Sequence, residues 1–288
     1  VNSDKINFNS SGTLQVNAAA GSSTLDLRVA NGQVGTIEVT GANVFTVDTL
    51  RNVSGSGTFT KTGSGTLEIV GSSTLSGTLN INAGTVDMQG TVSTASINVN
   101  GGTLTGDGTA GAALVIGSGG VLSPGNSPGT INAGNTTWAG GGSYLWEIND
   151  VDAGAGSDPG WDLLNVTGTL TISATSGNEF DIDITSLTLA NAAGDVHDFN
   201  GLNNYSWIIA SASGGISGFD ASDFTLSLGG FSNPYDTTPG SWFISQSGNN
   251  ILLNYNYLGG PGGGGGGGGE SAVPEPNTLL YFGLATAG

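Results

Sequence analysis

A short tripeptide, glycine followed by threonine and an apolar residue, recurs along the first half of the chain and constrains its fold more than any other feature. It begins at Gly12, Gly35, Gly57, Gly65, Gly77, Gly84, Gly90 and Gly102, and again at Gly129 and Gly168. Several of the steps between these glycines are about 18 to 23 residues long, which is about one coil of a β-solenoid. We therefore expect a stack of similar coils.

Short alternating runs lie between the glycines, for example at residues 66–70, 79–82 and 96–100. Every second side chain in such a run points to one face of a strand, so the apolar set is expected to point inward. Glycine permits the sharp corners between strands, and threonine and asparagine suit a polar outer face. One coil cannot bury its own apolar face, so stacking must stabilise the fold.

The segment GSGTFTKTGSGTLEIVGSSTLSGTLNINAGTVDMQG, residues 55–90, resembles the autotransporter-associated β-strand repeat of bacterial surface proteins. The resemblance is strongest over residues 55–134, which end in GSGGVLSPGNSPGTINAG. It implies a right-handed parallel β-helix that is exported and exposed at a cell surface. We therefore expect an all-β chain in which residues 1–134 form solenoid repeats.

The composition changes after residue 134, because all five tryptophans and all six tyrosines lie beyond it. An open solenoid end exposes apolar core and unpaired strand edges, so a bulkier terminal section is expected there. We interpret residues 135–258 as an aromatic C-terminal β cap, and a separate β-sandwich remains the alternative. The aromatic side chains are expected to fill the core of the cap, although they could instead form a surface on which sugar rings stack.

The net charge is −18, and Lys5, Arg28, Arg51 and Lys61 are the only basic residues. An acidic surface without basic clusters repels phosphate backbones, so nucleic acid is not expected as a partner. Carboxylate oxygens favour calcium instead. The chain has no cysteine, which excludes disulfides, thiolate zinc sites and a cysteine nucleophile.

The densest carboxylate cluster is NDVDAGAGSDPGWD, which holds Asp150, Asp152, Asp158 and Asp162 in a glycine-rich loop. Flexible loops rich in oxygen can hold calcium, so these four residues are the candidate metal ligands. Their spacing matches neither the EF-hand nor the nonapeptide of calcium-binding β-rolls. The alternative is a solvated loop in which the aspartates accept hydrogen bonds from turns.

Catalysis is not expected from this sequence. His197 is the only histidine, and the many serines give it only chance partners for a triad. The carboxylate pairs Asp181 with Asp183 and Asp220 with Asp223 raise the possibility of a polysaccharide-active β-helix enzyme. In such an enzyme one carboxyl group acts as the acid and the other as the base, and only burial would separate their pKa values enough for that. No catalytic residue is assigned, and no cofactor is required.

The chain closes with VPEPNTLLYFGLATAG, residues 273–288, which resembles the start of a PEP-CTERM sorting signal at Val273, Pro274, Glu275 and Pro276. The resemblance implies retention in the inner membrane of a Gram-negative bacterium until an exosortase processes the protein, commonly in species that make exopolysaccharide. The apolar part begins at Thr278, is about 16 Å long as a helix and is followed by no basic residue, so we expect either that the chain is truncated within the signal or that its end has been trimmed.

Residues 259–272 form a glycine-rich linker between the expected body and the sorting signal. The glycine run is expected to behave as a flexible coil with a span of about 18 Å. Because the sequence begins with Val1, a secretion signal is expected to precede it.

Together these features predict an exported structural or adhesive protein of the cell surface or extracellular matrix, which associates with exopolysaccharide. One alternative is a self-associating filament subunit whose apolar tail adds as a strand to a neighbouring copy. The other alternative is the polysaccharide-active enzyme.

Overall fold

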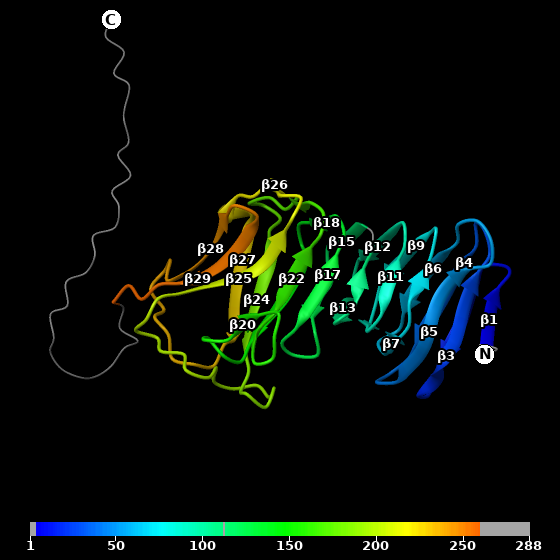
Figure 1. The fold of residues 1–288 in the computed structure, drawn as a ribbon, viewed down its shortest axis with the longest axis horizontal. Coiled ribbons are helices and arrows are strands. Elements are labelled where there is room, and N and C mark those ends of the chain that lie inside the picture. Colours follow the sequence, from blue (N-terminus) through cyan, green and yellow to red (C-terminus); the bar gives the residue numbers. More distant parts are fainter. Residues whose placement is uncertain (1–3, 112, 260–288) are drawn as a thin grey trace, which may run out of the picture.

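The computed structural model describes residues 4–111 and 113–259, which wind into an elongated stack of coils (Figure 1). Three ladders of parallel strands run along the stack, one strand of each ladder per coil. The second ladder is a nine-stranded sheet. Its strands are β2 (Gly12–Val16), β4 (Val34–Val39), β6 (Thr58–Thr62), β9 (Thr78–Ile81), β12 (Ser96–Val99), β15 (Ala113–Ile116), β18 (Thr136–Trp138), β23 (Leu170–Ile172) and β26 (Ile216–Ser217). The described part of the chain is therefore a parallel β-solenoid, as the repeats predict.

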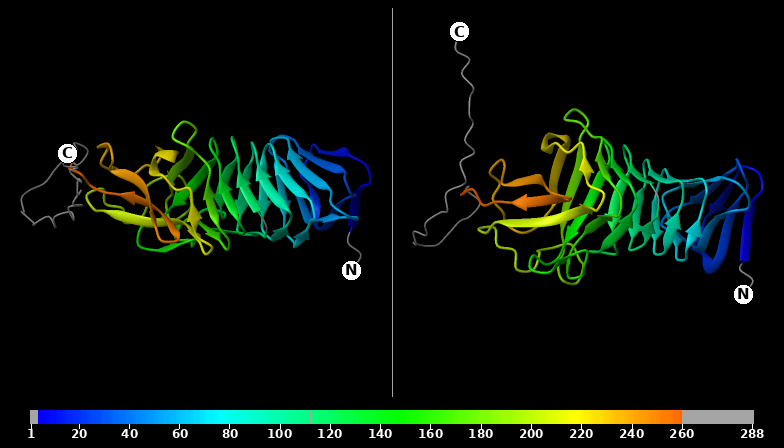
Figure 2. Two further views of the ribbon diagram at one scale, coloured as in Figure 1. Left: turned by 90° about the horizontal axis from the view of Figure 1, so that it is seen from above. Right: turned by 45° about the horizontal axis from the view of Figure 1, so that its top comes forward.

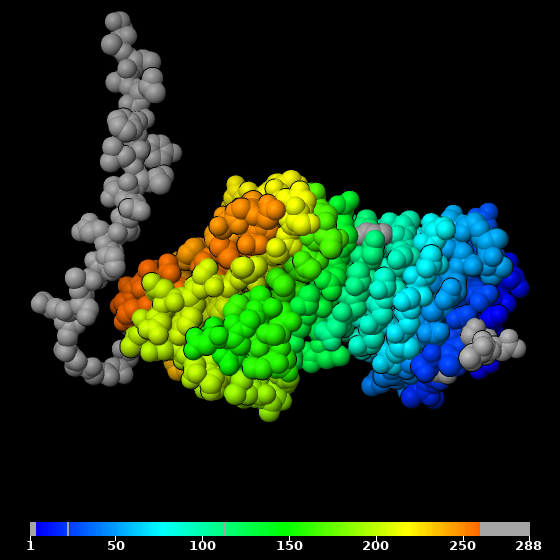
Figure 3. Space-filling view, in the orientation of Figure 1, coloured from blue at the N-terminus to red at the C-terminus, as the bar shows by residue number. Residues whose placement is uncertain are grey.

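The first and third ladders belong to one larger sheet, because the long strands β3 (Ala20–Val29) and β5 (Val44–Asn52) take part in both. The first ladder continues with β1 (Asp4–Phe8), β8 (Ser73–Thr74), β11 (Thr91–Ser93), β14 (Thr109–Ala110), β17 (Thr130–Ala133), β22 (Leu163–Val166) and β25 (Tyr205–Ala212). The third continues with β7 (Thr66–Ile69), β10 (Thr85–Met88), β13 (Thr103–Gly106), β16 (Val121–Pro124), β19 (Ser143–Ile148), β24 (Phe180–Ser186) and β27 (Phe224–Gly230). Bands of sequence colour follow one another along the molecule as coil succeeds coil (Figure 3).

Inward side chains alternate with outward ones along the strands, as expected for residues 66–70, 79–82 and 96–100. In the third ladder, Leu67, Val86 and Leu104 lie opposite one another in successive coils, and each is completely buried. Parallel in-register stacking thus places one apolar residue above the next, and such columns of inward side chains build the core.

Coil length varies along the stack. The stacked asparagines Asn80 and Asn98 are 18 residues apart, whereas Thr171 and Ser217, which also lie opposite one another, are 46 apart. The extra residues form loops after β19 and β24 that project from one side of the wider, C-terminal part of the stack (Figure 2). The first of these loops contains the short strands β20 (Gly154–Ala155) and β21 (Gly160–Trp161).

The solenoid does not end at residue 134. Coils continue to β27, and only then do β28 (Trp242–Ser247) and β29 (Asn250–Tyr255) turn back as an antiparallel hairpin, with β29 paired to β25. The change at residue 134 is therefore a change of composition within one continuous stack, because bulkier side chains fill the wider coils. A cluster of aromatic rings in stacked, tilted and edge-to-face contact lies at the C-terminal end of the core; its members are Phe199, Tyr205, Trp207, Phe231, Tyr235, Trp242 and Tyr255.

Most tryptophans serve the core, as expected for a cap. Trp138, Trp146 and Trp207 have at most 2 % of their surface exposed, and Trp138 stacks on Phe180 at 4.8 Å. The linker beyond Gly259 and the sorting signal at residues 273–288 lie outside the described residues. In residues 4–111 and 113–259, no helix is long and apolar enough to cross a membrane.

Candidate functional site

The outer face of the nine-stranded sheet carries one row of side chains in register through all its strands. We call these residues the polar row: Thr13, Thr36, Thr60, Asn80, Asn98, Val115, Thr137, Thr171 and Ser217. None of them is charged, and all but one can donate and accept hydrogen bonds. Adjacent strands lie about 4.8 Å apart, so the row repeats its polar groups at that spacing.

Hydrogen bonds between coils order this face. The side-chain amide of Asn98 donates to the Oδ1 atom of Asn80 at 3.0 Å, and that of Asn100 donates to Asn82 at 3.3 Å. Near the C-terminal end, the Ser217 hydroxyl lies 3.3 Å from that of Thr171. These side chains hold one another in place, so the face presents a fixed pattern of donors and acceptors.

The outer face of the third ladder is acidic instead. Glu68 and Asp87 lie opposite one another on β7 and β10, and Asp181 and Asp183 lie on β24. Burial, together with the nearby charges of Glu68 and Asp107, raises the pKa of Asp87. The solenoid therefore separates the uncharged polar row of the nine-stranded sheet from the carboxylates on the outer face of the third ladder.

The structure does not gather the four candidate calcium ligands into one group. Asp162 is fully buried: its Oδ1 accepts from the backbone N–H of Gly129 at 2.7 Å, and its Oδ2 from that of Glu147 at 3.0 Å. Asp158 is exposed and accepts from the side-chain amides of Asn149 and Asn191, each at 2.7 Å. The carboxylates of Asp158 and Asp162 thus hold loops and coils together.

Asp150 and Asp152 lie at the start of the same loop, just after β19, and Asp150 is less exposed than Asp152. The backbone N–H of Asp152 donates to Asp150 Oδ1 at 2.9 Å, the turn hydrogen bond expected of a solvated loop. Among residues 4–111 and 113–259, no three histidine or carboxylate side chains form a group that could hold a metal ion. Calcium at this loop stays a prediction.

The residues considered for catalysis are spread over the surface. His197 is 47 % exposed, and its Nδ1 lies 3.2 Å from Asp198 and 3.5 Å from Asp150. Asp181 accepts a hydrogen bond from the Ser227 hydroxyl. Asp220 caps the short 3₁₀ helix η1 (Ala221–Asp223) by accepting from Ser222. These contacts organise turns and neighbouring strands.

One acidic group was not expected from the sequence. Glu147, on β19, accepts a hydrogen bond from the Ser127 hydroxyl at 2.6 Å and lies close to the buried Asp162. Burial raises the pKa of Glu147, and it raises that of Asp162 further, with help from the Glu147 charge. Ser127 has φ 78°, in the left-handed region. The serine-proline-glycine motif at residues 127–129 indicated a turn here, but only the stacking of the coils brings Glu147 and Asp162 close to it.

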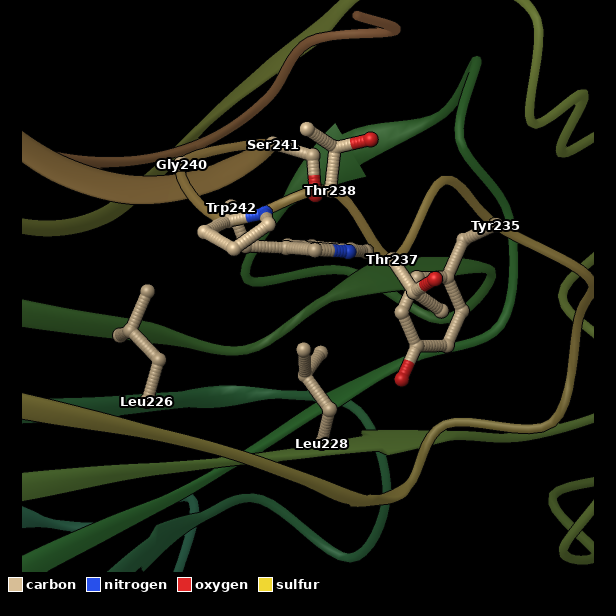
Figure 4. A pocket seen from close by; sticks show the side chains of 9 residues that line it. Leu226, Leu228, Tyr235, Thr237, Thr238, Gly240, Ser241 and Trp242 are labelled. Atoms are coloured by element: carbon tan, nitrogen blue, oxygen red, sulfur yellow. The ribbon is translucent and has the colours of Figure 1, made fainter. Parts of the chain in front are cut away.

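A cavity of about 240 Å³ lies at the C-terminal end of the solenoid (Figure 4). Leu226 and Leu228 of β27 form its floor, and the loop ending at Trp242 lies across from them. No charged residue lines it; the lining residues are Leu226, Leu228, Tyr235, Thr237, Thr238, Pro239, Gly240, Ser241 and Trp242. The indole N–H of Trp242 is buried and has no hydrogen-bond partner.

Comparison with known proteins gives no assignment: no family model matches the chain, and no curated protein matches it either.

Proposed function

We propose that this chain is an exported structural or adhesive protein of a bacterial cell surface or extracellular matrix, and that its polar row binds neutral exopolysaccharide. The observation that carries the proposal is the uncharged, in-register row on the nine-stranded sheet.

A neutral polysaccharide offers hydroxyl groups at regular intervals, which can exchange hydrogen bonds with threonine and asparagine side chains. Binding along the uncharged polar row removes no ion from water, so the desolvation penalty is small. Side chains that are already ordered, such as Asn80 and Asn98, lose little further entropy when a ligand binds. Many weak contacts along one long face then add up to retention in a matrix.

Export and surface sorting rest on the resemblance of residues 55–134 and 273–288 to bacterial surface repeats and to the PEP-CTERM signal. In this proposal an exosortase processes the tail near Val273–Pro276 after transient retention in the inner membrane.

Co-sedimentation with particulate cellulose, a neutral polysaccharide, tests the binding face. The triple variant Thr60→Asp, Asn98→Asp, Thr137→Asp places three charges in the polar row and should weaken retention about tenfold, ~1.4 kcal/mol. The matched control is Thr85→Asp, Thr103→Asp, Ser123→Asp, which adds the same three charges to the outer face of the third ladder and should leave retention unchanged. Equal loss in both variants would argue against the polar row as the binding face.

Intact mass spectrometry of the protein released from its native cells tests the sorting. A C-terminus within residues 273–276 is the expected result. A mature protein that ends at Gly288 would contradict processing and would favour the alternative filament subunit, whose presence light scattering at high concentration would show directly.

A further inference from the structure

Strand β27 has a free edge at the C-terminal end of the third ladder. In the described residues its ladder pairing is with β24 alone, through pairs such as Phe180 with Phe224 and Ile182 with Leu226. The first ladder is different, because β29 pairs along the equivalent edge of β25. The hairpin thus caps the first ladder and leaves the backbone groups on one side of β27 available to another strand.

The apolar side chains of β27 are also less covered than those one coil earlier. Phe180, Ile182 and Ile184 on β24 are completely buried. Leu226 and Leu228, the next inward residues of the stack, remain partly exposed and form the floor of the 240 Å³ cavity (Figure 4). One further strand with apolar side chains facing inward would complete this layer of the core.

The chain leaves the described body beside this cavity. The backbone N–H of Asn256 donates to the carbonyl oxygen of Ser241 at 2.7 Å, and the N–H of Leu258 donates to Asp236 Oδ2 at 2.7 Å. Both acceptors belong to the loop that lies across the cavity from β27. The described chain therefore ends, at Gly259, on the side of the cavity that lies across from β27.

The sequence beyond Gly259 contains one short segment suited to such an edge, TLLYF at residues 278–282. It is uncharged, apolar and rich in residues that favour strands, and its side chains alternate so that either Leu280 with Phe282 or Leu279 with Tyr281 faces inward. Residues 260–277, which join Gly259 to this segment, have a typical span of about 23 Å as a flexible coil, which gives an effective concentration in the millimolar range.

We propose that residues 278–282 of the same chain add as a strand to the free edge of β27, and that their inward side chains cover Leu226 and Leu228. The tether favours this contact over the same contact with a second copy, since intermolecular addition would need millimolar protein to compete. The proposal does not depend on polysaccharide binding.

Hydrogen exchange of the full chain tests the contact, with the peptide containing β27 as the reporter. The variant Leu280→Asp, Tyr281→Asp replaces one residue from each alternating set, so it disrupts the segment whichever set faces inward. The matched control, Ala285→Asp with Ala287→Asp, adds the same charge to the tail outside the segment. Neither variant touches the described body, so both proteins should fold normally.

Amides on the free side of β27 should exchange more slowly in the unchanged chain and in the control than in the Leu280→Asp, Tyr281→Asp variant. The expected difference is about tenfold, because a tail strand that is bound about nine-tenths of the time leaves these amides open to solvent for only about one-tenth of it. Exchange of β24 should be equal in all three proteins. Equal exchange of β27 in all three would overturn the proposal. Protection that appears only as the protein concentration rises, together with a dimer, would overturn the intramolecular contact and assign the edge to a second copy.

Discussion

The ammonium nitrogen of Lys61 lies 3.1 Å from the carbonyl oxygen of Ala83, one coil further along the solenoid. It also donates to the carbonyl oxygens of Thr62 and Gly63, each at 2.9 Å, and the side chain has no exposed surface. A lysine thus occupies an inward position, opposite Ile81, and joins two corners of the stack. Burial lowers its pKa from 10.5 to about 8.

Lys61→Met should change how stability depends on pH. In the parent protein, the unfolded chain binds the lysine proton more tightly than the folded chain does, so stability rises between pH 8 and 10.5. Over that window, the free energy of unfolding of the parent should rise relative to the variant by up to about 3 kcal/mol. Urea unfolding at pH 8 and pH 10.5 measures this difference; parallel curves would contradict it.

Gly77→Ala should destabilise the stack through steric overlap. A Cβ atom at Gly77 would overlap the carbonyl oxygen of Gly57 in the coil below. Forcing the coils apart should cost about 1–3 kcal/mol in thermal or urea unfolding. Gly177→Ala is the matched control, because a Cβ atom there meets nothing within 4 Å, and it should be neutral or slightly stabilising. A similar loss in both variants would mean that backbone freedom, not coil contact, decides the cost.

Asp162→Asn should remove a pH dependence of the stability of the folded protein. Burial and the Glu147 charge hold the pKa of Asp162 well above its ordinary value, so the folded state favours the protonated acid. The stability that this group contributes is complete below pH 3.8 and is lost as the pH rises through the folded-state pKa. The parent should therefore lose stability relative to Asp162→Asn between pH 4 and pH 7, and urea titrations at both values test this.

Tyr255→Phe should loosen the C-terminal cap. The Tyr255 hydroxyl donates to the carbonyl oxygen of Gly201 at 2.6 Å and accepts from the backbone N–H of Asp236 at 2.7 Å, so it joins two loops. Without the hydroxyl, the buried N–H of Asp236 loses this partner, at a cost of about 1–3 kcal/mol. Hydrogen exchange should accelerate at residues 200–204 and 235–241 and stay unchanged in β9 and β12. Acceleration throughout the solenoid would show that the cap is not a separate unit of stability.

The strand pattern of the fold could be predicted from the sequence, because alternation and glycine corners act locally. Residues 66–70 read as a strand with Leu67 and Ile69 inward, and both side chains are completely buried. The end of the solenoid could not be located this way. After residue 134 the coils lengthen and take in tryptophan, so the composition changes while the parallel pairing continues.

The candidate sites were harder to predict, since they depend on which coils lie side by side. Asp158 and Asp162 are four residues apart in one loop, yet one is exposed and held by Asn191 while the other is buried against Gly129. The polar row was foreseeable as a face rich in threonine and asparagine. Its exact members depend on the register of each coil, and the coils differ in length.

The sequence by itself determined the all-β class, the coil repeat, the inward and outward sets of residues and the acidic charge, because each follows from local composition and a period of two along a strand. The tertiary structure decided which residues meet across coils. It placed Lys61 inside the core and brought Glu147 and Asp162 together at one corner. It also left β27 with a free edge, whereas β29 covers the equivalent edge of β25. Such contacts depend on the strand register and on the length of every coil between the two residues, so no short segment of the sequence determines them.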